Sequence, residues 1–166
     1  AIAFLEGLSS RGETDVYAAL SPVLDAPRRP GLPAMVLMLS DGHPTTGLRD
    51  TRTLINTLSA ENERGHTVVA YSGGNTVNRP LLDMLAYRNK GAASVAPAIE
   101  DIGEQLPSFF QRFERPVLVD CRADFGRLDE ASIVPRQLPD VYADQPVQVY
   151  GRFDPAKDDL FAMRLE

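Results

Sequence analysis

The sequence predicts an α/β fold: a doubly wound, Rossmann-like parallel sheet with helices on both faces, followed by an antiparallel β segment. Three apolar runs of strand length, residues 34–39, 66–71 and 92–96, alternate with helical patterns, which is the order of a parallel sheet with crossover helices. The first run has no polar position, as expected of a strand that is buried on both faces. From Pro116 onward apolar and polar residues alternate, which is typical of half-buried strands.

Size and charge narrow the classes of function. The chain has 166 residues, of which 43% are hydrophobic, and a net charge of −6, so it is long enough for one domain with a sizeable core. An acidic balance argues against a nucleic-acid partner. No apolar run reaches the length that spans a membrane. We therefore expect neither a nucleic-acid partner nor a membrane-spanning segment.

The first residues resemble the end of a helix more than the start of a domain. Residues 2–9 place apolar side chains at helical spacing, and no initiator Met precedes them, so we expect the chain to be part of a longer protein. The next helix begins at Thr14 or Asp15, because either side chain can accept a hydrogen bond from a free first-turn N–H. It ends before Pro27. Its apolar stripe consists of Val16, Ala19, Leu20 and Val23.

Two further helices connect the predicted strands. The first begins at Asp50 or Thr51 and ends at Gly65. Asn78 caps the second, which has Pro80 in its first turn, where a missing N–H is harmless. Their buried stripes are Leu54, Ile55 and Leu58 in the first helix and Leu81, Leu82, Leu85 and Ala86 in the second.

The last elements are a helix and a β-rich tail. Apolar residues between Ile99 and Phe113 have helical spacing, but Pro107 should kink this helix, so we expect it to begin late or to be broken there. In the tail, we expect strands at residues 117–124, 145–152 and 160–165. These patterns divide the chain into the C-terminal part of an α/β domain, residues 1–114, and a β-rich segment, residues 115–166.

Asp41 is the residue on which a functional interpretation depends. It follows the first strand in Ser40-Asp41-Gly42, and ligands of open α/β sheets gather beyond the carboxyl ends of the strands. Asp-Gly after a strand is, however, more often a turn than a site. His43 lies in the same loop, whereas His66 opens a strand and is expected at its solvent edge. Two histidines are too few for a histidine metal cluster.

Two kinds of ligand fit these residues. The loop from Ser72 to Thr76 follows a strand, which its glycines should end, and precedes a helix, where backbone N–H groups can hold a small anion or nucleotide. An ordinary connecting loop is the commoner explanation. The other ligand is a hard cation, because Mg²⁺ takes oxygen ligands, keeps several waters and needs only one or two carboxylates. Asp41 offers a carboxylate and Thr14 a hydroxyl, provided that their loops meet.

Three stretches of the sequence carry a family resemblance. They are RGETDV at residues 11–16, AMVLMLSDGHPTTG at residues 34–47, and a tail that contains PVLVD, PRQLPDVYADQPV and VYGRFD. In these stretches the chain resembles a von Willebrand factor type A domain, and more closely the A domain of the inter-alpha-trypsin inhibitor heavy chain family and its bacterial relatives. The resemblance covers nearly the whole chain, with the stretches in the same order.

The resemblance implies a metal-ion-dependent adhesion site that holds Mg²⁺, or else Mn²⁺ or Ca²⁺. In the family, the ligands come from an Asp-x-Ser-x-Ser motif on the first strand, a Thr in a later loop and an Asp that ends the fourth strand. Thr14 and Asp41 stand at the positions of that Thr and that Asp. The residues beside Asp41 are then expected to contact the partner: Ser40, Gly42, His43 and Thr45.

The sequence departs from the family pattern in two places. The loop reads Gly12-Glu13-Thr14, where the family usually has Gly-Gly-Thr, and no Asp-x-Ser-x-Ser occurs in the 166 residues. We therefore expect the first strands and the other metal ligands upstream of Ala1, and weak or no metal binding by this chain alone.

The function implied by the resemblance is binding, not catalysis. We expect a protein–protein or adhesion module in which a carboxylate of the partner completes the coordination of the metal, in an extracytoplasmic or cell-surface protein. The alternatives are an enzyme or sensor that binds a small anion at the loop of residues 72–76, and a structural domain whose site has decayed. Because residues 34–39 would border the missing first strand, we also expect pairing with the upstream segment or with a second copy.

Overall fold

The main sheet formed by the described residues has three parallel strands. The computed structural model describes residues 2–9, 12–29, 31–126, 128–143, 145–154, 156 and 164–165. Within them the strand order is β1-β2-β3, formed by β1 (Met35–Leu39), β2 (Thr67–Gly73) and β3 (Ala93–Ala96). The central β2 pairs in parallel with both neighbours. The predicted α/β class with a parallel sheet is confirmed.

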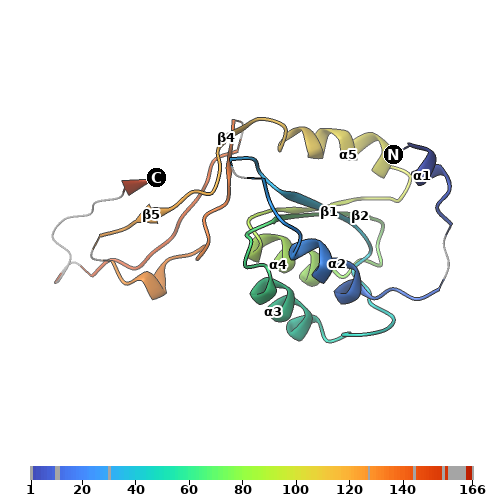
Figure 1. Ribbon diagram of the computed structural model, residues 1–166, viewed down its shortest axis with the longest axis horizontal. Helices are drawn as coiled ribbons and strands as arrows, with labels where there is room; N and C mark the ends of the chain where they lie inside the picture. The colour runs from blue at the N-terminus through green and yellow to red at the C-terminus, as the bar shows by residue number, and fades with distance from the viewer. Residues whose placement is uncertain are drawn as a thin grey trace.

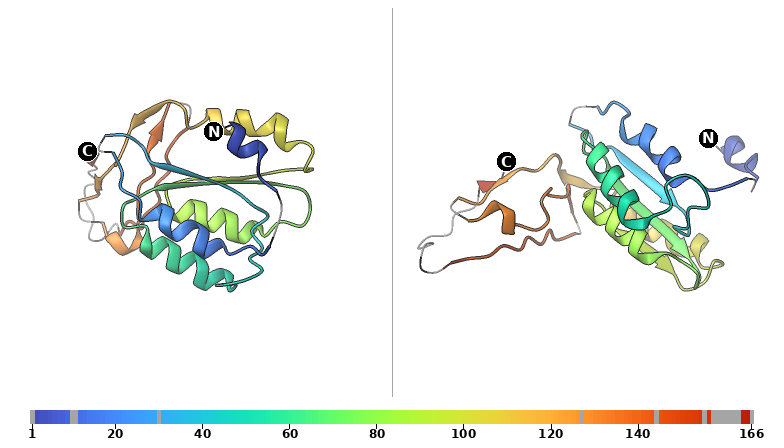
Figure 2. Two further views of the ribbon diagram at one scale, coloured as in Figure 1. Left: turned by 45° about the vertical axis from the view of Figure 1, so that its right-hand side comes forward. Right: turned by 90° about the horizontal axis from the view of Figure 1, so that it is seen from below.

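Helices cover both faces of the sheet, as predicted (Figures 1 and 2). On one face lie α2 (Val16–Leu24), α3 (Thr51–Glu61) and α4 (Arg79–Arg88), and on the other lies α5 (Ile102–Gln111). The short α1 (Ile2–Glu6) buries none of its residues. Within the described ranges, no helix is both long and apolar enough to cross a bilayer.

Alternating side chains of the strands divide the core into two clusters. Met38, Val68 and Ala70 pack against the layer of α2, α3 and α4. Val69 and Tyr71 face α5. On that side the rings of Tyr71, Phe109, Phe113 and Tyr142 follow one another with centroid distances of 5.1, 5.6 and 5.4 Å. Tyr142 lies beyond the predicted boundary at residue 115, so the tail of the chain contributes to this core.

The helices begin where the capping residues predict. The side chains of Asp15, Asp50 and Asn78 accept hydrogen bonds from N–H groups in the first turns of α2, α3 and α4, at 2.9, 2.8 and 3.2 Å. Each cap satisfies an N–H that has no acceptor inside its own helix. Of the two alternatives expected at the start of each helix, Asp15 rather than Thr14 caps α2, and Asp50 rather than Thr51 caps α3.

The first strand differs from the prediction that both its faces are buried. Met38 faces the three-helix layer, but Leu37 and Leu39 on the opposite face are 38% and 59% exposed. They are exposed because α5 packs on β2 and β3 and leaves this part of β1 uncovered. Among the described strands, none pairs with the outer edge of β1.

Two other local predictions are wrong, and a third is confirmed only in part. β2 continues to Gly73 instead of ending at residue 71. The last helix, α5, begins late, at Ile102, which was one of the two expected outcomes, but it is not broken at Pro107; the carbonyl that loses its partner belongs to Gly103, which is exposed to water. His66 is only 5% exposed. The Asn62 side chain holds it by pairing with both its backbone N–H and its carbonyl, each at 2.8 Å.

The tail forms antiparallel pairs, as predicted, but shorter ones. β4 (Pro116–Leu118) pairs with β6 (Val141–Tyr142), and β5 (Ala123–Asp124) pairs with β7 (Arg164–Leu165). A short 3-10 helix, Glu130–Ser132, lies between β5 and β6.

Two predicted strands of the tail are wrong in extent. Residues 117–124 are interrupted at Asp120, which has φ +56°. Residues 145–152 make only isolated bridges, from Gln145 and Tyr150, because Pro146 cannot donate to a ladder. Residues 160–163 of the third predicted strand lie outside the described residues.

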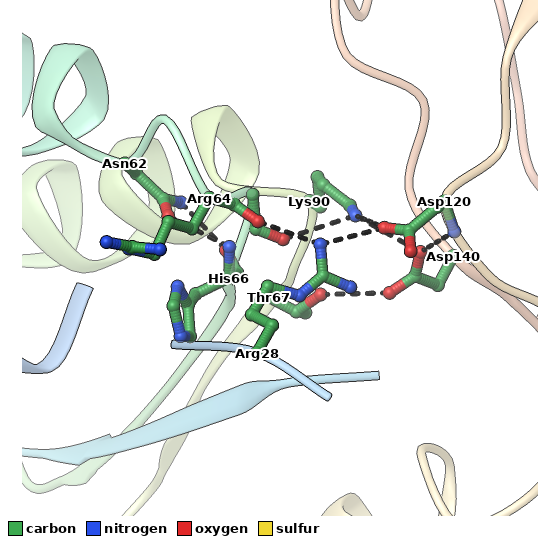
Figure 3. Close-up of polar contacts among 9 residues, drawn as sticks. Arg28, Asn62, Arg64, His66, Thr67, Lys90, Asp120 and Asp140 are labelled. Atoms are coloured by element: carbon green, nitrogen blue, oxygen red, sulfur yellow. Dashed lines mark hydrogen bonds and ion pairs between the residues drawn. The ribbon is translucent and has the colours of Figure 1, made fainter. Parts of the chain in front are cut away.

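A polar network joins this β-rich tail to the end of the sheet where the strands begin (Figures 1 and 3). The carboxylate of Asp140, which is buried, accepts hydrogen bonds from the Thr67 hydroxyl at 3.2 Å and from the Asp120 N–H at 2.9 Å. It also lies 3.1 Å from Nζ of Lys90. The guanidinium of Arg28 lies 2.8 Å from Asp120. The tail is therefore anchored through ion pairs as well as through Tyr142.

Candidate functional site

The Asp41 carboxylate is exposed just beyond the end of β1. Its Oδ1 accepts a hydrogen bond from the N–H of His43 at 3.0 Å, and its backbone carbonyl accepts one from the N–H of Asn78 at 2.8 Å. No described residue donates a hydrogen bond to Oδ2. The loop therefore fixes the carboxylate through one oxygen and leaves the other available to a ligand.

The Thr14 loop meets the Asp41 loop, as the cation hypothesis requires. The N–H of Thr14 donates to Oγ1 of Thr45 at 2.8 Å, and the N–H groups of Thr45 and Thr46 donate to the Thr14 carbonyl at 2.9 and 3.3 Å. Thr14 is exposed. Its hydroxyl makes no hydrogen bond to a described residue. Two side-chain oxygen atoms without a hydrogen-bond donor among the described residues are thus carried by loops that are bonded to each other.

Two glycines allow this packing. Gly42 has φ +76°, and a Cβ there would lie 3.2 Å from the Asn78 Cβ. Gly47 has φ +65°, and a Cβ there would collide with the carboxylate of Asp15. Both positions need a left-handed backbone and a close approach, which only glycine allows at low cost. The Asp41 loop is therefore shaped by the helix caps beside it.

Asn78 has a role that the sequence reasoning missed. Besides capping α4, its side-chain amide donates to the Gly42 carbonyl at 3.1 Å and to the Thr51 hydroxyl at 3.2 Å. It therefore ties the Asp41 loop to the starts of α3 and α4. Its position before Pro80 indicates a cap, but no sequence signal indicates a contact with a loop 36 residues earlier.

The residues expected to contact a partner differ in their surroundings. His43 and Thr45 are exposed, and Ser40 is half-buried, with its hydroxyl accepting from the Gly42 N–H at 3.1 Å. Gly42 is buried, so it shapes the loop and offers little surface. His66 lies at the other end of the sheet and belongs to the core.

Some of the backbone donors in the loop from Ser72 to Thr76, and at the start of the helix after it, already have acceptors. The N–H groups of Gly74 and Asn78 already donate to the carbonyls of Ala96 and Asp41, at 3.0 and 2.8 Å. The N–H of Leu81, in the first turn of α4, donates to the Asn78 cap. The backbone donors that would hold an anion at this strand-to-helix connection are therefore partly in use.

The comparisons with known proteins identify the family. Residues 1–95 match the family model described as the von Willebrand factor type A domain. The chain belongs to this family. The resemblance predicted from the sequence is confirmed.

Curated relatives extend the match of this von Willebrand factor type A chain into its tail. It is 21% identical to inter-alpha-trypsin inhibitor heavy chain H2 of Sus scrofa, over 93% of this chain and 17% of that protein. It is 22% identical to heavy chain H1 of Homo sapiens, over 77% and 14%. A von Willebrand factor A domain-containing protein of Dictyostelium discoideum is 23% identical, over 91% and 7%. The chain thus spans less than a fifth of the length of these relatives.

The oxygen donors of this von Willebrand factor type A chain are of the chemical type that a hard metal ion prefers, but there are too few of them to form a complete site. Thr14 and Asp41 supply uncommitted oxygen atoms, which suit Mg²⁺. Among the described residues, no three His, Cys, Asp or Glu side chains gather in an arrangement that would hold a metal ion. One carboxylate and one hydroxyl replace little of the hydration shell of Mg²⁺. A complete site needs further ligands.

Proposed function

We propose that this chain is part of a protein-interaction module in which Thr14 and Asp41 are two ligands of a metal-ion-dependent adhesion site. The observation that supports this most directly is the pair of hydrogen bonds between Thr14 and Thr45, which holds together the two loops that carry these ligands. The remaining ligands would come from sequence upstream of Ala1.

The residues of this chain would act by position and charge. A bound Mg²⁺ or Mn²⁺ would supply a coordination position at which a carboxylate of a partner protein can be held. Asp41 would contribute negative charge, and the backbone N–H of His43 keeps the Asp41 carboxylate oriented. Ser40, His43 and Thr45 would surround the partner's carboxylate. No step of this scheme makes or breaks a covalent bond, so we propose binding and not catalysis.

The proposal includes a division of the chain. Residues 1–114 would carry the interaction module, and residues 115–166 would be a β-rich extension that is anchored to it by Asp140 and Tyr142. The extension meets the sheet at the end away from Asp41, which leaves the proposed metal edge uncovered by the tail.

The proposal is tested by measuring how metal changes the unfolding temperature of the full-length protein, by which we mean the protein that includes the proposed ligands upstream of Ala1. A ligand that binds only the folded state raises this temperature. We expect Mn²⁺ to raise it in the wild type and to raise it less in Thr14→Val, which lacks the hydroxyl. Thr46→Val is the matched control, since its hydroxyl makes no hydrogen bond to a described residue. Equal stabilisation of Thr14→Val and wild type would exclude Thr14 as a ligand.

A further inference from the structure

A polar hollow lies where the β-rich extension meets the sheet, at the opposite end of the strands from Asp41. Its volume is about 610 Å³, which is within the usual range of small-molecule sites, about 300–1,000 Å³. Two acidic residues line it, Glu63 and Asp120. Its cationic lining residues are Arg28, Arg64, Lys90, Arg122 and Arg136.

Three of these cations, Arg28, Arg64 and Lys90, form ion pairs with nearby aspartates. Arg28 lies 2.8 Å from Asp120, and Lys90 lies 3.1 Å from Asp140 and 3.7 Å from Asp120 (Figure 3). Arg64 pairs with Asp25 at 3.3 Å.

The guanidinium groups of Arg122 and Arg136 have no acidic partner among the described residues, and the one unpaired carboxylate of the lining is that of Glu63. On a chain with a net charge of −6, this hollow has a local excess of positive charge.

The positive charges at the hollow lower the pKa values of two residues, Asp120 and His66. The hydrogen bond from Arg28 holds the pKa of Asp120 below its ordinary value, and the charges of Arg28 and Lys90 lower it further. His66, which does not line the hollow, also has a lowered pKa, first because it is buried and then because Arg28, Arg64 and Lys90 repel a proton on it.

Contacts of the paired cations also join the two sides of the hollow. The side chains of Lys90 and Asp140 are 7% and 0% exposed, and Lys90 further contacts the Gly65 carbonyl at 3.3 Å. These contacts hold the two sides of the hollow, the sheet and the extension, in one arrangement. Arg122 and Arg136 are exposed on the extension side, so a ligand can reach them without breaking an ion pair.

We propose that this hollow binds a small molecule that carries a phosphate group, with Arg122 and Arg136 as its cationic contacts. Each guanidinium presents a planar fork of N–H donors that matches two oxygen atoms of an oxyanion. A phosphate has enough oxygen atoms to engage both forks, whereas one carboxylate has only two. The hollow is separate from the Thr14 and Asp41 loops, so this inference does not rest on the proposed metal site.

Pyrophosphate is the probe for this inference, with titration calorimetry of the full-length protein at constant ionic strength. We expect saturable binding to the wild type that is at least about tenfold weaker in Arg122→Gln/Arg136→Gln, because two charge-assisted contacts are lost. Arg122→Lys/Arg136→Lys should bind between the two, because it keeps the charge but not the forks. Arg152→Gln, an exposed arginine of the same extension, should bind like the wild type.

Two results would overturn the inference. One is pyrophosphate binding that is the same in the wild type and the glutamine pair. The other is acetate binding as tightly as pyrophosphate at equal ionic strength, because a carboxylate would then suffice. Circular dichroism spectra and unfolding midpoints of each variant establish that a loss of binding does not arise from a loss of fold.

Discussion

The backbone N–H of Thr14 donates to the hydroxyl of Thr45 at 2.8 Å, and the N–H of Thr45 donates back to the Thr14 carbonyl at 2.9 Å. The two residues are 31 positions apart in the sequence. This reciprocal pair fixes the Thr14 loop against the Asp41 loop. The geometry of a metal ion held by both loops would therefore depend on the side chain of Thr45, which is not one of the proposed metal ligands.

Replacing Thr45 by Val should loosen the two loops, because Val keeps the shape of Thr but cannot accept the hydrogen bond from Thr14. We expect the free energy of unfolding to fall by about 1 kcal/mol, the usual net contribution of one hydrogen bond. Denaturant unfolding measures this difference. Thr46→Val, one residue further along, should change stability by less. A Thr45→Val variant as stable as Thr46→Val would show that the side-chain bond does not hold the loops.

Part of this site could be predicted from the sequence, because some of its features depend only on residues that are neighbours in the chain. Asp41 at a strand end and Asp15, Asp50 and Asn78 as caps follow from patterns of a few neighbouring residues. The contact of Asn78 with the Gly42 carbonyl does not, because it depends on how α4 packs beside the Asp41 loop.

The same distinction explains the errors in the fold. Residues 34–39 have the composition of a strand buried on both faces, but Leu37 and Leu39 are exposed because α5 lies over β2 and β3. Burial depends on which neighbours are present, and composition does not specify them. His66 is buried for a similar reason, because Asn62 from the end of α3 binds its backbone.

The ion pair of Lys90 and Asp140 should be important for stability. Lys90→Met leaves the Asp140 carboxylate buried without its cation, so we expect a loss of about 3–5 kcal/mol in the free energy of unfolding. Arg64→Met is the matched control, because the side chains of Arg64 and Asp25 are 47% and 83% exposed, and such a pair contributes less than about 1 kcal/mol. Similar losses in the two variants would contradict the anchoring role of Asp140.

His66 should make stability depend on pH below neutrality. Burial, followed by repulsion from Arg28 and Arg64, lowers its pKa from the ordinary 6.5. The unfolded chain therefore takes up a proton before the folded chain does, and folding stability falls as pH drops from about 7 to about 5. His66→Gln should reduce this fall, whereas His43→Gln, at the exposed loop, should not. Urea unfolding across this pH range measures the effect, and an unchanged fall in His66→Gln would refute it.

The uncovered side of β1 should cause the 166-residue chain to associate. An exposed strand edge with apolar neighbours is a template for pairing with another strand, and Leu37 and Leu39 lie beside that edge. We expect light scattering to give a mass that rises with protein concentration. Leu37→Lys/Leu39→Lys should reduce this rise, whereas Met84→Lys, an exposed apolar residue on α4, should not. A wild-type chain that stays monomeric at all concentrations would contradict this expectation.

Mn²⁺ titration calorimetry of the full-length protein measures directly whether Asp41 is a metal ligand. The informative variant is Asp41→Asn, because the amide oxygen can still accept the hydrogen bond from His43 while the negative charge is removed. Asp83→Asn, an exposed carboxylate on α4, is the matched control. We predict that the wild type and Asp83→Asn bind Mn²⁺ alike, and that Asp41→Asn binds it at least about tenfold more weakly with an unchanged unfolding midpoint. Wild-type Mn²⁺ affinity in Asp41→Asn would show that Asp41 is not a metal ligand and is only a residue of a turn.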